Sequence, residues 1–286
     1  MFRGSRAVDQ GLLTWDELRS SAWRPLFRDG YADADVPASH RLRCLAAARL
    51  LLPPGGAIAG RSAAALFEVT RLAGTDPVEV LVPSACQFEP VNGLRVHRAT
   101  LSGPELVERA GMVTTSPVRT CWDLASWLDP VEAVVLIDAM LGRRLVTVPG
   151  LRDYALGWTG RRGWRKLLRA VDLADPAAES PQESRVRVRL VLAGLPRPVA
   201  QHVVTDGGRF LARVDLAWPE LRIAIEYDGV WHSTAEQLHR DRRRLNRLLG
   251  GDWIVLHVTG QRLREDFDGF LAEVRAALRS RAPRAA

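Results

Sequence analysis

The stretch "VDLAWPELRIAIEYDGVWH", from Val214 to His232, most constrains what this chain folds into. It contains two apolar runs that alternate as β-strands do, joined by a tight Pro-Glu connection. Four ionisable side chains interrupt these runs: Asp215, Glu226, Asp228 and His232. Burying an ionised group in a sheet is costly unless the group is paired or binds a metal. The fold must therefore provide a partner for these acids.

The carboxylates are in phase on the two predicted strands. Because strand side chains alternate faces, Glu226 and Asp228 share a face, and Asp215 lies on the matching face of the first strand. Cross-strand neighbours lie about 5 Å apart, so Asp215 and Glu226 are expected to meet. Carboxylates at that separation repel unless a positive group lies between them. Mg²⁺, which takes one or two carboxylates plus water and phosphate oxygens, suits this position. The alternative is a salt-bridge network on an exposed face, in which Arg213 and Arg222 neutralise the acids.

The predicted helix before the strands, "SPQESRVRVRLVLAGLP", directs one more carboxylate toward them. At about 100° per residue, Glu183 lies on the same stripe as Val186 and Leu190, which is the expected inward face. The spacing between Ser180 and Glu183 also fits a capping box, in which Glu183 only caps its own helix.

The segment after the strands, "TAEQLHRDRRRLNRLLGG", is predicted to be a helix with one basic stripe. Asp241 lies on the opposite side, among the leucines, and is a candidate second-layer residue of the site. This stripe is either a solvated face or a surface that follows a phosphate backbone. Its members are Arg240, Arg243, Arg244 and Arg247. The strand–helix–strand order implies a parallel crossover and hence a mixed sheet flanked by helices.

Composition restricts the classes of function. The 286 residues allow two or three domains, and a net charge of +7 suits a polyanionic partner. Lys166 is the only lysine, which nearly excludes mechanisms that need a catalytic lysine. Three scattered cysteines, the absence of a signal-peptide pattern and the absence of an 18-residue apolar run predict a cytoplasmic protein without a membrane segment.

Three segments are predicted along the chain, giving an α/β protein that is α+β overall. Residues 1–70 contain short helices, the first capped by Thr14, and an aromatic strand–turn. This is compatible with a winged helix or with another small helical domain. Residues 71–172 form a small α/β domain without a catalytic constellation, where His97 and Cys121 are interpreted as structural. Residues 173–286 contain the acidic strands.

The order of motifs in the third segment resembles the PD-(D/E)XK nuclease superfamily. It is most similar to the branch around the very-short-patch repair (Vsr) endonucleases, whose bacterial relatives carry "E-x-D-G-x-x-H". Glu226, Asp228, Gly229 and His232 match this motif, and the likeness covers roughly residues 180–265. The first 150 residues are similar to an actinobacterial arrangement with the winged helix of AbiEi antitoxins. This second likeness rests on "GLLTWDELRS", "LFRDGYA" and "TTSPVRTCWDLA".

The resemblance implies a restriction-endonuclease-like domain that hydrolyses DNA phosphodiesters with Mg²⁺ or Mn²⁺, as an endonuclease or nickase. Asp215 would be the central metal ligand, Glu226 or Asp228 the second ligand, and Glu183 would hold a water molecule near the metal. The superfamily's lysine is absent, because Asp228 follows Tyr227. Histidines fill this role in the Vsr branch, so His232 is the candidate general base, because an ordinary histidine, with a pKa of about 6.5, can accept a proton at neutral pH. The alternative for His232 is a hydrogen-bonding residue at a helix start.

Two other functions stay open. The missing lysine and the AbiEi likeness are compatible with a non-catalytic DNA-binding regulator of antitoxin type that carries a degenerate nuclease domain. RNA is a further candidate substrate, because a basic groove and a metal do not select the sugar. No sequence feature specifies a protein partner, and the sequence does not decide between a monomer and a homodimer.

Overall fold

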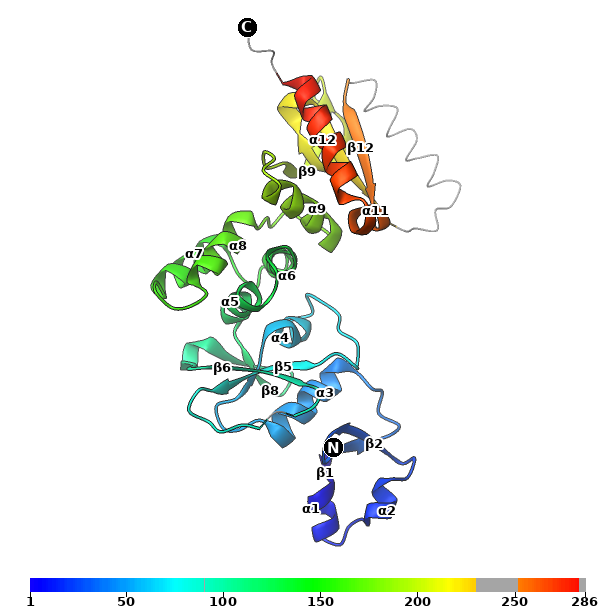
Figure 1. Ribbon diagram of the computed structural model, residues 1–286, viewed down its shortest axis with the longest axis vertical. Helices are drawn as coiled ribbons and strands as arrows, with labels where there is room; N and C mark the ends of the chain where they lie inside the picture. Colours follow the sequence, from blue (N-terminus) through cyan, green and yellow to red (C-terminus); the bar gives the residue numbers. More distant parts are fainter. Residues whose placement is uncertain (90, 230–251, 283–286) are drawn as a thin grey trace. The chain divides into compact units, whose positions relative to one another are not determined.

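The computed structural model describes residues 1–89, 91–229 and 252–282 (Figure 1). The chain is a mixed α+β protein that divides into two compact units. Unit 1 comprises Met1–Leu128 and Leu145–Leu168, and unit 2 comprises Asp129–Arg144 and Arg169–Ala286. None of the helices in the described part of the chain has the length and apolar character needed to cross a membrane.

Unit 1 begins with a small antiparallel sheet in the order β1-β3-β2. The predicted cap at Thr14 is confirmed: its hydroxyl accepts the Glu17 N–H, and Glu17 accepts the Thr14 N–H in return. The aromatic strand–turn is a hairpin of β2 and β3. The elements are β1 (Phe2–Arg3), α1 (Gly4–Asp9), α2 (Trp15–Leu18), β2 (Trp23–Phe27) and β3 (Gly30–Asp33).

The rest of unit 1 is built on a five-stranded mixed sheet in the order β6-β5-β4-β8-β7. The expected segment boundary at residue 70 falls after β4, which already pairs with β5 in this sheet. Helix α5 begins at a Ser-Pro pair, where Ser116 accepts the Arg119 N–H. The elements are α3 (His40–Ala46), η1 (Ala47–Leu51), β4 (Ala57–Ile58), α4 (Gly60–Leu66), β5 (Val78–Pro83), β6 (Leu94–Ala99), η2 (Gly103–Glu105), β7 (Leu106–Arg109), β8 (Met112–Thr115), α5 (Pro117–Trp127) and α7 (Val148–Gly157).

Unit 2 contains a four-stranded sheet in the order β12-β11-β10-β9. Strands β9, β10 and β11 are antiparallel neighbours, and β11 pairs with β12 in parallel, as the crossover prediction requires. The C-terminal helical segment is divided into two helices, because Asp266 ends α11 and caps α12 through the Gly269 N–H. The elements are α6 (Pro130–Gly142), α8 (Trp164–Leu173), α9 (Pro181–Leu192), β9 (Val199–Asp206), β10 (Arg209–Trp218), η3 (Pro219–Leu221), β11 (Ile223–Asp228), β12 (Ile254–Thr259), α11 (Gly260–Glu265) and α12 (Phe267–Arg281). The first half of α8, up to Leu168, belongs to unit 1.

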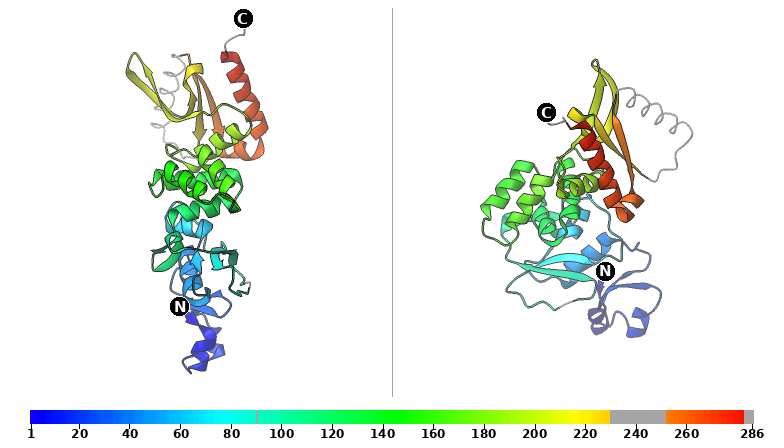
Figure 2. Two further views of the ribbon diagram at one scale, coloured as in Figure 1. Left: turned by 90° about the vertical axis from the view of Figure 1, so that its left-hand side faces the viewer. Right: turned by 45° about the horizontal axis from the view of Figure 1, so that its top comes forward.

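Helices α9 and α12 cover one face of this sheet, and α12 lies along the strands (Figure 2). Leu190 of α9 and Phe270 of α12 are fully buried against Ile223 and Ile225 of β11. Each such side chain contributes about 1.5–3 kcal/mol by leaving water. A second buried cluster on the sheet comprises Val204, Ala212, Val214, Ala217 and Ala224.

The predicted alternation of β10 is wrong at one position, Asp215. Val214 packs in the cluster of Ala217, whereas Leu216 packs with α9 and α12. On β9, Gln201 lies between the pairs Val214–His202 and Leu216–Ala200, and its φ of 52° is left-handed. An irregular residue of this kind interrupts the pleat and shifts side chains to the other face. Asp215 therefore lies where the strand changes faces.

Candidate active site

The carboxylate of Asp215 lies where the ladder between β10 and β11 ends. Leu216–Ile225 is the last pair of that ladder, so Glu226 occupies the next position opposite Asp215. The Asp215 Oδ2 atom accepts the backbone N–H of Tyr227 at 2.8 Å. Both acids are only partly buried. The register thus sets two partly exposed acidic residues at opposing positions on neighbouring strands.

The next strand adds a histidine that was not among the predicted site residues. Glu226 of β11 is in register with His257 of β12. The His257 Nδ1 atom lies 3.2 Å from both carboxylate oxygens of Asp228. The His257 side chain is 43% exposed and that of Asp228 is 52% exposed, so this pair is open to a ligand in solution. His257 is the one polar residue in the apolar run "IVLHV", and this interruption is the sequence signal that identifies it.

Glu183 reaches the sheet from the first turn of α9. It is 7% exposed and shares its buried stripe with Val186 and Leu190, which confirms the predicted inward direction. Its Oε2 atom accepts the Gln201 amide at 2.8 Å and the Glu179 N–H at 3.1 Å. In a capping box the Glu183 carboxylate would accept the N–H of the cap residue Ser180. Here it accepts the N–H of Glu179 and the Gln201 amide, so it does more than close a capping box. Gln201, which is opposite Asp215, connects it to the acidic strands.

Helix α9 is fixed to α6 by charged contacts, and these contacts position Glu183. Ser184 and Arg187 both donate to Asp138 of α6, at 2.6 and 2.5 Å, and burial raises the pKa of the Asp138 carboxyl. Arg185 forms a two-bond pair with Glu132, and those hydrogen bonds raise the pKa of the Arg185 guanidinium. The first turn of α9 therefore has little freedom to move against α6.

The salt-bridge interpretation of the acidic strands loses one of its two arginines. Arg213 donates to both carboxylate oxygens of Glu179, at 2.9 and 2.8 Å. A paired guanidinium of this geometry neutralises the carboxylate that it contacts. The charge of Arg213 is thus balanced by Glu179 on the segment before α9.

The donor set fits a magnesium ion better than a metal that needs a complete protein cage. Mg²⁺ keeps several waters and takes only one or two carboxylates, and Asp215 with Glu226 supplies that number. Within the described ranges, no three His, Cys, Asp or Glu side chains are grouped so as to hold a metal ion. The remaining predicted site residues lie outside the described residues. These are His232, Arg240, Asp241, Arg243, Arg244 and Arg247.

Comparisons with known proteins give two curated relatives, both from Mycobacterium tuberculosis. They are "Uncharacterized protein MT2308" of strain CDC 1551 / Oshkosh and "Uncharacterized protein Rv2248" of strain ATCC 25618 / H37Rv. Each is 29% identical over 213 residues, which cover 72% of this chain and 78% of the relative. No family model matches the chain, and no solved structure matches it.

Proposed function

We propose that the C-terminal region is a metal-dependent nuclease that hydrolyses DNA phosphodiester bonds, as an endonuclease or nickase. The observation that carries the proposal is the register of β10 and β11, which sets Asp215 and Glu226 at opposing positions where the ladder ends. Two partly exposed carboxylates at opposing positions on neighbouring strands supply the number and kind of ligands that Mg²⁺ takes from a protein.

Each described residue has a specific part in this proposal. Asp215 and Glu226 hold the Mg²⁺ or Mn²⁺, and the Tyr227 N–H orients one oxygen of Asp215. When bound, the ion polarises a phosphoryl oxygen and lowers the pKa of water. Glu183, held by Gln201, orients a water molecule at the edge of the site.

We assign proton transfer to a histidine, because the only lysine of the chain is Lys166 of α8, in a different part of the protein from the acidic strands. His257 is paired with Asp228, and a carboxylate partner fixes the orientation of an imidazole. Either His257 or the sequence-predicted His232 acts as general base, and the two are separated by substitution. His257→Gln keeps a polar side chain of similar size while removing the imidazole ring.

The test is cleavage of supercoiled, linear, mismatched and single-stranded DNA, and of RNA, by the purified full chain with Mg²⁺ or Mn²⁺. Asp215→Asn and Glu226→Gln should each lower the cleavage rate by about 100-fold or more, because each removes a charge that holds the ion. Glu273→Gln is the matched control, since it removes an α12 carboxylate paired with Arg262 instead. If wild type and Asp215→Asn are equally inactive on every substrate, the chain is not a nuclease.

A second candidate is a non-catalytic DNA-binding regulator with a degenerate nuclease domain. Two observations favour it. Among the described residues no three potential metal ligands are grouped. The Glu183 carboxylate is already bonded within the protein, to the Glu179 N–H and the Gln201 amide. Calorimetry with Mn²⁺ separates the two functions. A degenerate site binds no divalent ion, whereas the proposed nuclease binds one and loses affinity in Asp215→Asn.

A further inference from the structure

Unit 1 contains a cavity that the predicted functions do not use. Its volume is about 670 Å³, within the range of small-molecule sites. Its walls come from β6, from α5 and from the segment that joins α7 to α8. The sequence predicts no catalytic constellation in this region and indicates a structural role for His97. His97 nevertheless lines this cavity.

The cavity has an excess of positive charge on one side. Arg161, Arg162 and Lys166 all line it. Lys166 donates to the Ser126 carbonyl at 3.0 Å, and a carbonyl does not neutralise its charge. Arg161 donates to the Thr100 carbonyl at 3.1 Å and also lies 3.5 Å from the Glu105 Oε1 atom, which Arg119 contacts as well. Arg162 is exposed and has neither a hydrogen bond nor an ion pair with any residue that the structure describes. These three cations can receive an anionic group of a ligand.

The acids of the cavity do not cancel this charge. Glu105 accepts from Arg119 and from the Tyr154 hydroxyl, both at 2.6 Å. Burial alone raises the pKa of the Glu105 carboxyl, but these hydrogen bonds outweigh it and lower that pKa to about 2. Its single negative charge is shared by two guanidinium groups, those of buried Arg119 and of Arg161, and therefore balances only one of them. Burial raises the pKa of the Asp123 carboxyl to about 7, so Asp123 carries only part of a charge at neutral pH.

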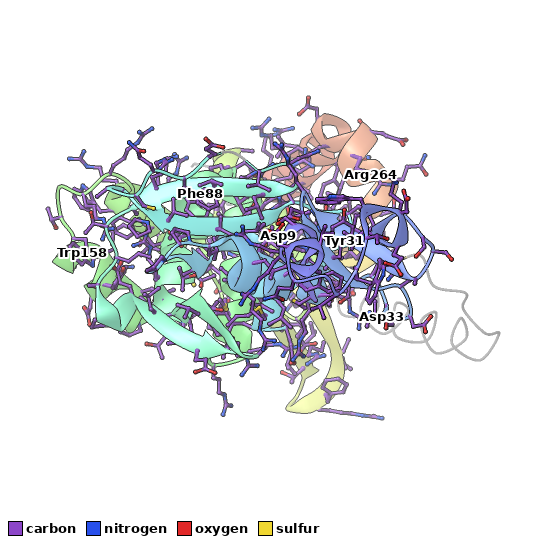
Figure 3. All side chains as sticks on the ribbon, turned by 90° about the horizontal axis from the view of Figure 1, so that it is seen from below. Asp9, Tyr31, Asp33, Phe88, Trp158 and Arg264 are labelled. Atoms are coloured by element: carbon purple, nitrogen blue, oxygen red, sulfur yellow. The ribbon has the colours of Figure 1, made fainter. Side chains whose placement is uncertain are left out.

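Aromatic rings also line the cavity, and two of them lie against Arg161. The Arg161 guanidinium carbon lies 4.6 Å from the Trp158 ring centroid and 5.5 Å from that of Trp122. Trp158 is 37% exposed and lies at the periphery, on the segment that follows α7 (Figure 3). His97 stacks on Trp127 with their centroids 3.5 Å apart and an interplanar angle of 3°. A flat ring finds stacking partners here, next to the cations.

Three buried polar atoms of the lining have no hydrogen-bond partner among the described residues. They are the His97 Nε2, Asp123 Oδ2 and Ser126 Oγ atoms. The Asp123 side chain is 1% exposed, and its other oxygen accepts from Arg119 at 2.9 Å. An unpaired buried polar group costs about 1–3 kcal/mol. Donors and acceptors on the edge of a ligand would remove that cost.

We propose that this cavity binds a free nucleoside phosphate. The phosphate contacts Arg161, Arg162 and Lys166, the base stacks on the tryptophans, and its polar edge bonds to the unpaired atoms of Asp123, Ser126 and His97. All of these residues lie within unit 1, and the proposal does not depend on the nuclease function of unit 2. A chain-terminal nucleotide of a nucleic acid has the same chemistry and is separated from the free ligand by experiment.

The experiment is calorimetry on the full chain in EDTA, which keeps the proposed nuclease silent. The probes are AMP, GMP, CMP and UMP, with adenosine, inorganic phosphate and a 5′-phosphorylated oligonucleotide as comparison ligands. At least one mononucleotide should bind more tightly than both adenosine and phosphate. Arg162→Gln and Lys166→Gln should each weaken this binding about tenfold or more, because each removes a charged donor to the phosphate.

Two controls keep the result specific. Arg165→Gln removes a cation of the same helix that stacks on Trp164 and does not line the cavity, so nucleotide affinity should be unchanged. Asp215→Asn should also bind nucleotide as wild type does. The proposal fails if no mononucleotide binds, if phosphate alone binds equally well, if only the oligonucleotide binds, or if Arg165→Gln weakens binding as much as Lys166→Gln.

Discussion

The buried ion pair between α9 and α6 gives the sharpest test of how unit 2 holds Glu183 in place. Arg187 is 1% exposed, and it donates to Asp138 and to the Leu173 carbonyl. Arg187→Met keeps most of the volume but removes the charge. Asp138 is then left buried with neutral donors only, from Ser184 and from the Asp175 N–H. Removing one partner of a buried pair costs about 3–5 kcal/mol.

Differential scanning calorimetry and urea unfolding of the full chain measure this loss. At about 4 °C per kcal/mol for a domain of roughly this size, the transition of unit 2 should fall by about 12–20 °C. The Arg187→Met/Asp138→Asn double variant should lose less than the sum of the single variants, because the two groups are coupled.

Arg185→Met is the matched control on the same helix. Arg185 and Glu132 are 30% and 41% exposed, so solvent screens the pair and its loss should cost no more than about 1 kcal/mol. If Arg187→Met costs as little as Arg185→Met, the buried pair does not fix α9, and Glu183 must be positioned in some other way.

Three further predictions concern unit 1. Cys86, which is partly exposed, should react with Ellman's reagent in the native protein. Cys44 and Cys121 are buried, and burial raises the pKa of both thiols, so they should react only on unfolding. Gly60→Ala should destabilise the protein by about 2 kcal/mol or more in urea titrations, because Gly60 has a φ of 52° and an added Cβ would lie 2.2 Å from a Glu79 oxygen. The control is Gly103→Ala, whose Cβ would meet nothing within 4 Å, and it should change the free energy of unfolding by less than about 0.5 kcal/mol. Burial gives the Asp123 carboxyl a pKa of about 7 in the folded protein, against an ordinary value of 3.8, so Asp123 favours the folded state below about pH 4 and loses that contribution as pH rises through 7. Between pH 4 and pH 8 the free energy of unfolding of Asp123→Asn should therefore rise by up to about 4 kcal/mol relative to that of wild type. Parallel pH profiles of the two proteins would contradict this.

The sequence predicted the start of a helix, the inward face of α9 and the parallel pairing of β11 with β12, because those features depend on nearby residues or on the order of elements. Thr14 caps a helix where its pattern indicates. The inward direction of Glu183 follows from helical phase alone, and the structure confirms it. The parallel pairing of β11 with β12 follows from the order of elements.

Long-range geometry is what the sequence did not reveal. Strict alternation on β10 fails because Gln201, on a different strand, takes a left-handed conformation and the pleat changes faces at Asp215. His257 is about thirty residues from Asp228 and meets it only because two strands are in register. The cavity in unit 1 combines residues of β6, α5 and α8, and no local pattern joins them.

Lys166 has a practical consequence for work on this protein. The chain carries one ε-amino group, at the edge of the cavity, and its only other primary amine is the N-terminus. An amine-reactive dye therefore labels two positions in the whole molecule, and blocking the N-terminus leaves one. A fluorophore at that single position would report on the cavity without any substitution in the protein.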